Sequence, residues 1–132
     1  MTKAKAIKLL MVTTANEIGT LGKVSASLKD AGVNIFHLCA YGEGDKANFM
    51  IAVSDLDKAA QVLKGIGYDA SQEDALEAEF ENAPGTLSPV AKKLGDAGID
   101  IKYIYGTTGD GSKVIGVMST DDNQKALSLI NG

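Results

Sequence analysis

Asn-Ala-Pro-Gly-Thr-Leu (NAPGTL) at positions 82–87 repeats, with two changes, the stretch Asn-Glu-Ile-Gly-Thr-Leu (NEIGTL) found 66 residues earlier at positions 16–21. At this offset residues 16–64 align with 82–130 without a gap, and 13 of the 49 pairs are identical. Self-similarity over such a span indicates a duplicated structural unit. The sequence therefore predicts two related copies within 132 residues.

The spacing of the apolar residues changes along each copy. Residues 7–14 and 75–80 are predicted to form strands. Just after the repeated stretch, apolar residues in 21–28 and 87–94 recur at intervals of three and four, which is typical of one face of a helix. Gly32 and Gly98 follow these helices, where a C-cap favours a positive φ.

The remainder of each copy predicts a β-hairpin and a second helix. The Gly-rich stretches GEGDK and GTTGDGSK are typical of turns that join two antiparallel strands. Ser54/Asp55 and Thr120/Asp121 offer N-caps for helices that run to about 64 and 130. The predicted hairpin strands are 33–42 with 47–53 in the first copy, and 99–106 with 113–119 in the second.

Each copy is thus a β-α-β-β-α unit of the α+β class, the ferredoxin-like plan with an antiparallel sheet and helices on one face. The expected domains are residues 1–71 and 72–132. Residues 68–71 are expected to add a short fourth strand to the first copy. The second copy has no residues left for a final strand, so its open edge should be covered by the first copy or by another subunit.

Composition narrows the functional classes. The net charge is −4 and the pI is near 4.9, which argues against binding to nucleic acid or to an anionic membrane. All 13 basic residues are lysine, so a bound anion must be held by backbone N–H groups, hydroxyls or lysine. Cys39 is the only cysteine, which excludes an internal disulfide and favours the reducing cytoplasm. No spacing typical of a metal or cofactor site is found.

The NxPGxL pattern, followed by a helix and then by AG(V/I)(N/D)I, resembles the ACT domain, a small-molecule-sensing module of regulated enzymes in amino-acid metabolism. Residues 82–101 carry this pattern in full. Residues 16–35 carry it with Ile18 in place of the proline. The resemblance covers nearly the whole chain as two tandem units, and it implies a regulatory protein without catalysis.

The residues of the repeated turn fit the binding of an amino acid independently of the resemblance. A glycine turn that leads directly into a helix presents unpaired N–H groups at the positive end of the helix dipole, which suits a carboxylate. The amides of Asn16 and Asn82, and the side chains of Asn34 and Asp100, can accept hydrogen bonds from an ammonium group. A free amino acid, or a similar small zwitterion, is therefore the expected ligand.

The resemblance also implies how the two copies combine. In ACT pairs that bind amino acids, the turn of one unit faces the second strand of its neighbour. Carried over to this chain, that arrangement gives two candidate sites at the junction of the copies. One consists of Asn82, Pro84, Gly85, Thr86 and Leu87 with Asn34 and Ile35; the other consists of Asn16, Ile18, Gly19, Thr20 and Leu21 with Asp100 and Ile101.

Several alternatives remain open. The repeated turns could be structural, with Asn16 and Asn82 serving only as caps, in a regulatory subunit that acts through contacts with a partner enzyme. A small enzyme acting on acyl phosphates is disfavoured because the chain has no arginine for the phosphate. Apolar Leu9, Met11, Phe36 and Leu38 in the first copy correspond to Ala75, Glu77, Lys102 and Ile104 in the second, which suggests a homodimer that packs through the first copy.

Overall fold

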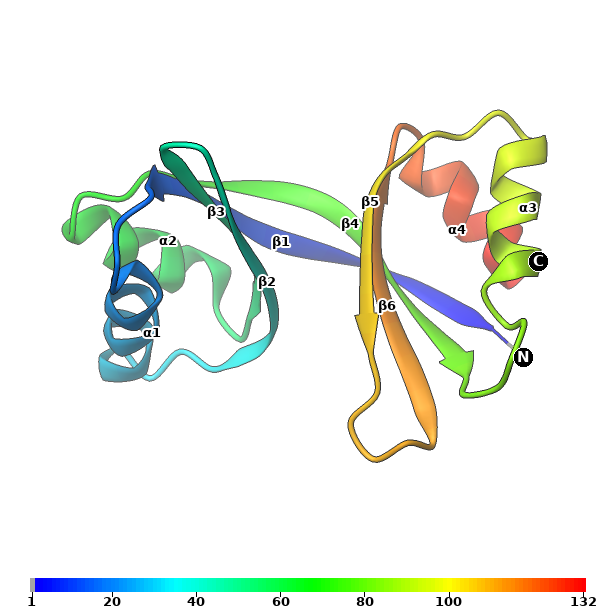
Figure 1. Ribbon diagram of the computed structural model, residues 1–132, viewed down its shortest axis with the longest axis horizontal. Coiled ribbons are helices and arrows are strands. Elements are labelled where there is room, and N and C mark those ends of the chain that lie inside the picture. Colours follow the sequence, from blue (N-terminus) through cyan, green and yellow to red (C-terminus); the bar gives the residue numbers. More distant parts are fainter. Residues whose placement is uncertain (1) are drawn as a thin grey trace. The chain divides into compact units, whose positions relative to one another are not determined.

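The computed structural model describes residues 2–132. They form two compact units, and each has the predicted β-α-β-β-α order (Figure 1). The first unit is Lys8–Glu73, and the second combines residues 2–7 with Asp74–Gly132. This division differs from the expected ranges of 1–71 and 72–132 mainly in the segment before Lys8, which lies with the second unit. No described helix is long and apolar enough to cross a membrane.

The first unit contains two helices packed against one face of its sheet (Figure 1). Its strands lie in the order β2-β3-β1, and all the pairs are antiparallel. The core under the helices includes Leu10, Leu28 and Leu63, none of which is exposed. The elements are β1 (Lys3–Ala15), α1 (Thr20–Asp30), β2 (Ile35–Glu43), β3 (Lys46–Val53) and α2 (Leu56–Gly65).

The second unit repeats this arrangement. Its strands lie in the order β4-β6-β5, again antiparallel, with two helices on one face (Figure 1). Leu76, Leu94 and Met118 form the centre of its core. The elements are β4 (Ala70–Glu81), α3 (Ser88–Asp96), β5 (Ile101–Thr107), β6 (Lys113–Thr120) and α4 (Asn123–Asn131).

The start of β1 supplies the strand that the second copy lacks. Residues 3–7 belong to the second unit, and β1 neighbours β4 in the sheet order. The Lys5 ammonium lies 3.3 Å from the Glu77 carboxylate. The Asn131 side chain accepts a hydrogen bond from the Ala4 N–H at 2.7 Å and donates one to the Ala4 carbonyl at 2.8 Å. The open edge expected from the sequence is therefore covered by a segment of the first copy.

The strand β4 likewise contributes to both units. Its first residues belong to the first unit, where Ala70 packs against the core. The sequence predicts a short strand at 68–71 and a separate strand at 75–80, but Ala70–Glu81 forms one strand of 12 residues. The prediction of two strands was wrong. The polar residues between them lack the alternation of apolar residues that predicts a strand, yet they lie within β4.

The repeat keeps its offset of 66 only up to the hairpins. Leu10 pairs with Ile51 in the first unit, and Leu76 pairs with Met118 in the second. The first members of these pairs differ by 66 residues and the second members by 67, so the second unit has one additional residue between these matched strand positions.

The additional residue changes which residues correspond in the last helix. Asp55 caps α2 by accepting from the Lys58 N–H, and Asp122 caps α4 by accepting from the Lys125 N–H, each at 3.1 Å. The predicted cap at Thr120/Asp121 is therefore wrong by one residue. Asp121 instead accepts a hydrogen bond from the Asp100 N–H at 3.0 Å.

Both predicted glycine C-caps are confirmed. Gly32 has a φ of 72° and Gly98 a φ of 74°. Immediately after them, the Val33 N–H donates to the Leu28 carbonyl at 2.9 Å, which is the bond of a Schellman motif. A residue with a Cβ would be strained at these two positions.

Candidate functional site

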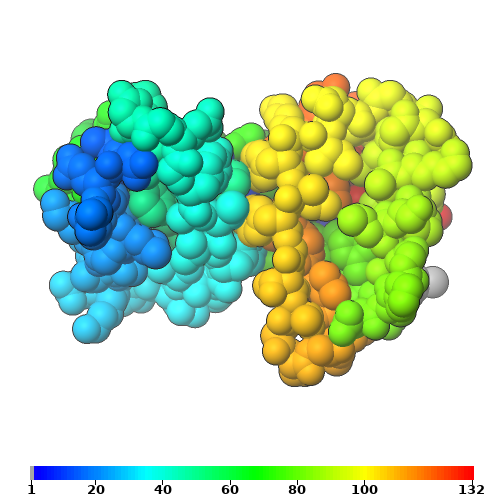
Figure 2. Space-filling view, viewed as in Figure 1, coloured from blue at the N-terminus to red at the C-terminus, as the bar shows by residue number. Residues whose placement is uncertain are grey.

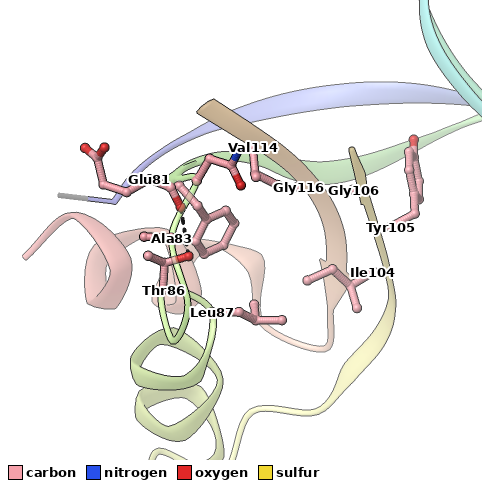
Figure 3. A pocket seen from close by; sticks show the side chains of 11 residues that line it. Glu81, Ala83, Thr86, Leu87, Ile104, Tyr105, Gly106, Val114 and Gly116 are labelled. Atoms are coloured by element: carbon pink, nitrogen blue, oxygen red, sulfur yellow. Dashed lines mark hydrogen bonds between the residues drawn. The ribbon is translucent and has the colours of Figure 1, made fainter. Parts of the chain in front are cut away.

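In the second unit, the stretch 82–87 forms the turn between β4 and α3. Gly85 has a φ of 82°, in the left-handed region that glycine adopts without strain. The Thr86 hydroxyl donates to the Glu81 carbonyl at 2.9 Å, a bond drawn in Figure 3. The Ala83 N–H donates to the same carbonyl at 3.0 Å. Glycine and threonine are thus the residues that close this turn.

The corresponding turn in the first unit also has a glycine at positive φ, but its threonine bonds to a carbonyl three residues earlier, whereas Thr86 bonds to one five residues earlier. Gly19 has a φ of 94°, and the Thr20 hydroxyl donates to the Glu17 carbonyl at 2.9 Å. Ile18, which replaces the proline, is fully exposed. Leu21 is half exposed at the start of α1.

The two repeated asparagines fasten these turns to the neighbouring hairpins. The Asn82 amide nitrogen donates to the Gly111 carbonyl at 2.7 Å, and that of Asn16 donates to the Gly44 carbonyl at 3.2 Å. Each side chain therefore has a structural role through its nitrogen. Its amide oxygen is a separate acceptor, which is the atom that the sequence assigns to a ligand ammonium.

The helices that follow the repeated turns differ from the other two helices at their N-termini. Among the described residues, no side chain caps α1 or α3, and neither helix has an acidic residue in its first turn. By contrast, aspartate caps both α2 and α4. No capping side chain and no first-turn carboxylate therefore competes for the first N–H groups of α1 and α3, which leaves the positive ends of these helices suited to an exogenous anion.

A cavity of about 350 Å³ lies beside the turn of the second unit. Figure 2 shows the hollow on the surface between β5 and the segment that leads into α3. Of the predicted site residues, Asn82, Thr86 and Leu87 line it, whereas Pro84 and Gly85 lie in the turn outside the lining. The other lining residues are Phe80, Glu81, Ala83, Ile104, Tyr105, Gly106, Val114 and Gly116.

The close-up in Figure 3 separates the side chains that face the cavity from those that do not. Leu87 and Ile104 point toward one another from the turn and from β5. Tyr105 points to the opposite side of its strand, as expected for a neighbour of Ile104. The Glu81 carboxylate also points away from the other labelled side chains.

Glu81 forms an ion pair with Lys113 on the adjacent strand, and the two residues face each other in the β4–β6 register. The hydrogen bond from Lys113 lowers the pKa of the Glu81 carboxyl, and the same bond raises the pKa of Lys113. Because both groups are exposed, the pair is worth little to stability. It nevertheless keeps the Glu81 charge paired beside the cavity.

The predicted residues on the second strands lie at the other end of the first helices. Asn34 and Asp100 are exposed just before β2 and β5, whereas the turns lie at the starts of α1 and α3. The side chains of Ile35 and Ile101 pack against the cores of their own units. In the second unit the predicted residues at the start of the second strand, Asp100 and Ile101, therefore do not line the cavity beside the turn, although later residues of β5 do. The pairing of each turn with the strand of the other copy remains a prediction.

The sequence reasoning missed the strand residues of the cavity, namely Phe80 and those of the β5–β6 hairpin. Ile104, Gly106, Val114 and Gly116 could have been found from the alternation of side chains, since they share the helix-side face with buried Met118. The offset of 66 concealed this correspondence, because it matches Gly116 with Met50 instead of Phe49.

The remaining candidates from the sequence show no site. Cys39 is a half-buried free thiol. Within residues 2–132, no cluster of histidine, cysteine and carboxylate side chains suits a metal ion. In the Gly-rich loop before β6, Asp110 accepts hydrogen bonds from the hydroxyl and the N–H of Ser112, which lower the pKa of its carboxyl. These local bonds explain the position of the Asp110 carboxylate, so no ligand is needed to explain it.

Comparisons with known proteins agree on the fold. A protein from Bacteroides thetaiotaomicron has 26% identity and a TM-score of 0.88, over 96% of this chain and 87% of that one. The ligand-free regulatory subunit of aspartate kinase from Thermus thermophilus has 12% identity and a TM-score of 0.68, over 95% and 89%. Aspartokinase III from E. coli, in complex with aspartate and ADP, has 11% identity and a TM-score of 0.64, over 98% and 31%.

A search of curated protein sequences finds no match to this chain. The model of one protein family, described as an ACT domain pair, matches residues 5–131. That range includes both copies of the turn and nearly all of both units. The resemblance noted in the sequence is thereby confirmed, and the chain belongs to the ACT domain pair family.

Proposed function

We propose that this protein is a non-catalytic sensor that binds a free amino acid at the turn of its second unit. The observation that carries the proposal is the cavity beside residues 82–87, next to a helix start that no side chain caps. Its volume lies at the lower end of the ~300–1,000 Å³ of small-molecule sites. A metabolite of amino-acid size suits that space.

In this proposal the ligand carboxylate lies against the N–H groups at the start of α3. The helix dipole and the unpaired N–H groups stabilise an anion there without arginine. The ligand ammonium lies near the amide oxygen of Asn82, with Asn34 as its expected second acceptor. Family membership supports a regulatory ligand-binding role.

Ligand binding would act by shifting a population of conformations. A ligand that favours one arrangement of the chain increases its population by no more than its preference for that arrangement. A partner enzyme, or a second copy of this chain, would respond to the favoured arrangement. The lone free thiol of Cys39 is consistent with this role in the cytoplasm.

A thermal-shift screen against the twenty amino acids tests the proposal. A ligand at a hundredfold excess over its Kd stabilises the folded state by ~2.7 kcal/mol, so at least one amino acid should raise the Tm by several degrees. Asn82→Ala should abolish the rise, and Asn34→Ala should weaken it. Asn16→Ala, which removes the matching side chain from the first turn, provides the control for loss of a hairpin bond. No rise with any amino acid would refute the proposal.

A second candidate is a regulatory subunit that acts through protein contacts, with both turns structural. It is favoured by exposed apolar side chains on β2, where Phe36 is 63% and Leu38 38% exposed, whereas Leu9 of the expected patch is buried. Such a surface suits a homodimer or a partner enzyme. Light scattering after size-exclusion chromatography tests the homodimer, and a monomer at micromolar concentration would exclude it.

A further inference from the structure

The cavity of the second unit has mainly apolar walls. Phe80 and Val114 line it from β4 and β6, and Ile104 and Leu87 line it from β5 and the start of α3. The polar side chains among its lining already form bonds. Thr86 donates to the Glu81 carbonyl, the Asn82 nitrogen donates to Gly111, and the Glu81 carboxylate is paired with Lys113. The space itself therefore suits an apolar group.

Two glycines make room for this space. Gly106 on β5 faces Gly116 on β6, and neither fills the helix-side face of the sheet. A Cβ built on Gly116 would lie 3.0 Å from Cε2 of Phe80, so the ring rests directly against that glycine. The floor of the cavity is consequently backbone and the edge of an aromatic ring.

The first unit has its core ring at the position that corresponds to Gly116. There Ala40 on β2 faces Phe49 on β3, and Phe49 is a buried core residue. The offset of 67 in the hairpin makes Phe49 the counterpart of Gly116. The two units thus carry a core ring on different strands: Phe49 on β3 in the first, and Phe80 on β4, whose ring lies against Gly116, in the second.

We propose that the cavity is the side-chain pocket of the ligand, and that it selects amino acids with an aliphatic or thioether side chain, such as valine, leucine, isoleucine or methionine. This inference rests on the proposed function, which places the carboxylate at the adjacent turn. An ionised ligand side chain would lose its hydration among apolar walls without gaining an opposite charge, because Glu81 is already paired. The proposed pocket is the one lined by the β5–β6 hairpin and the start of α3 in the second unit.

Titration calorimetry with leucine, alanine, aspartate and lysine tests the selectivity. For the unmodified chain we expect leucine to bind at least tenfold more tightly than the other three. Ile104→Phe places a ring in the cavity and should weaken leucine at least tenfold more than alanine. Leu38→Phe makes the matching change in the first unit and should leave the affinity for leucine unchanged.

Leu87→Ala provides a second test in case Ile104→Phe fails to fold. Leu87 is half exposed, so its truncation removes one wall of the cavity without disturbing the core. It should also weaken leucine more than alanine. If leucine binds but aspartate or lysine binds equally well, or if neither variant changes the order of affinities, the side-chain pocket is refuted while the amino-acid site stands. If none of the twenty amino acids binds the unmodified chain, the proposed function itself fails.

Discussion

The two units place an aromatic ring in their cores from different strands. In the first unit Phe49 extends from β3 and is opposite Val12 on β1. In the second, Phe80 extends from β4, is opposite Val114 on β6, and its ring lies against Gly116. Both rings are buried, with 3% and 4% of their surface exposed. Each core thus keeps one ring, and in the second unit a cavity lies beside that ring. Duplicated units can thus keep a fold while the strand that carries the core ring changes.

The largest effect should come from removing the two rings. Phe49→Ala should destabilise the protein by ~3–5 kcal/mol, the usual cost of emptying a packed phenylalanine site. Phe80→Ala should cost less, because one side of that ring already borders a cavity and has fewer packing partners to lose. Urea denaturation followed by circular dichroism measures both. Equal losses would mean that the cavity does not loosen the packing around Phe80.

The next effect concerns the glycines of the repeated turns. Gly85→Ala and Gly19→Ala should each cost about 1–2 kcal/mol, since both residues have a positive φ that a Cβ disfavours. No heavy atom lies within 4 Å of a Cβ built at either position, so the cost should come from the backbone alone. The same denaturation experiment applies. A clearly larger loss at one turn would show that the two turns are not equivalent.

The N-caps of α2 and α4 test the one-residue difference between the two hairpins. Asp55→Ala and Asp122→Ala should each destabilise by about 1 kcal/mol, the typical value of an N-cap aspartate. The two losses should match because both side chains accept from the third residue of their helix. A loss at Asp55 without one at Asp122 would contradict the offset of 67 for α2 and α4.

The smallest effect is a pH dependence found only in the second unit. Glu81 has a lowered pKa because of Lys113, whereas Ala15 faces Lys46 at the matching position of the first unit. The stabilisation by this pair should be present above the unfolded pKa of glutamate and should be lost as the pH falls through the lower, folded pKa. NMR titration of the Glu81 carboxyl measures that pKa. In Lys113→Ala it should return toward its ordinary value; an unchanged value would exclude the pair as its cause.

The glycine C-caps, the four helices and the antiparallel hairpins could be predicted because each depends on residues close together in the sequence. The apolar spacing in 21–28 and 87–94 predicts α1 and α3, and the glycines at 32 and 98 predict their ends. The repeat itself indicates two copies of one unit, and the NAPGTL turn indicates the ACT domain. Local conformational preferences and a duplicated pattern suffice for these features.

The tertiary structure decided three features that the sequence left open. Residues 3–7 pair with the second unit, because its sheet edge can be completed by any strand of suitable length and the sequence does not say which. The additional residue before β6 shifts β6 and α4 by one residue, which only the strand register reveals. The cavity follows from that register, since it sets Gly116 beneath Phe80 and opposite Gly106. A pocket depends on which side chains meet across strands, and that is a property of pairing in three dimensions.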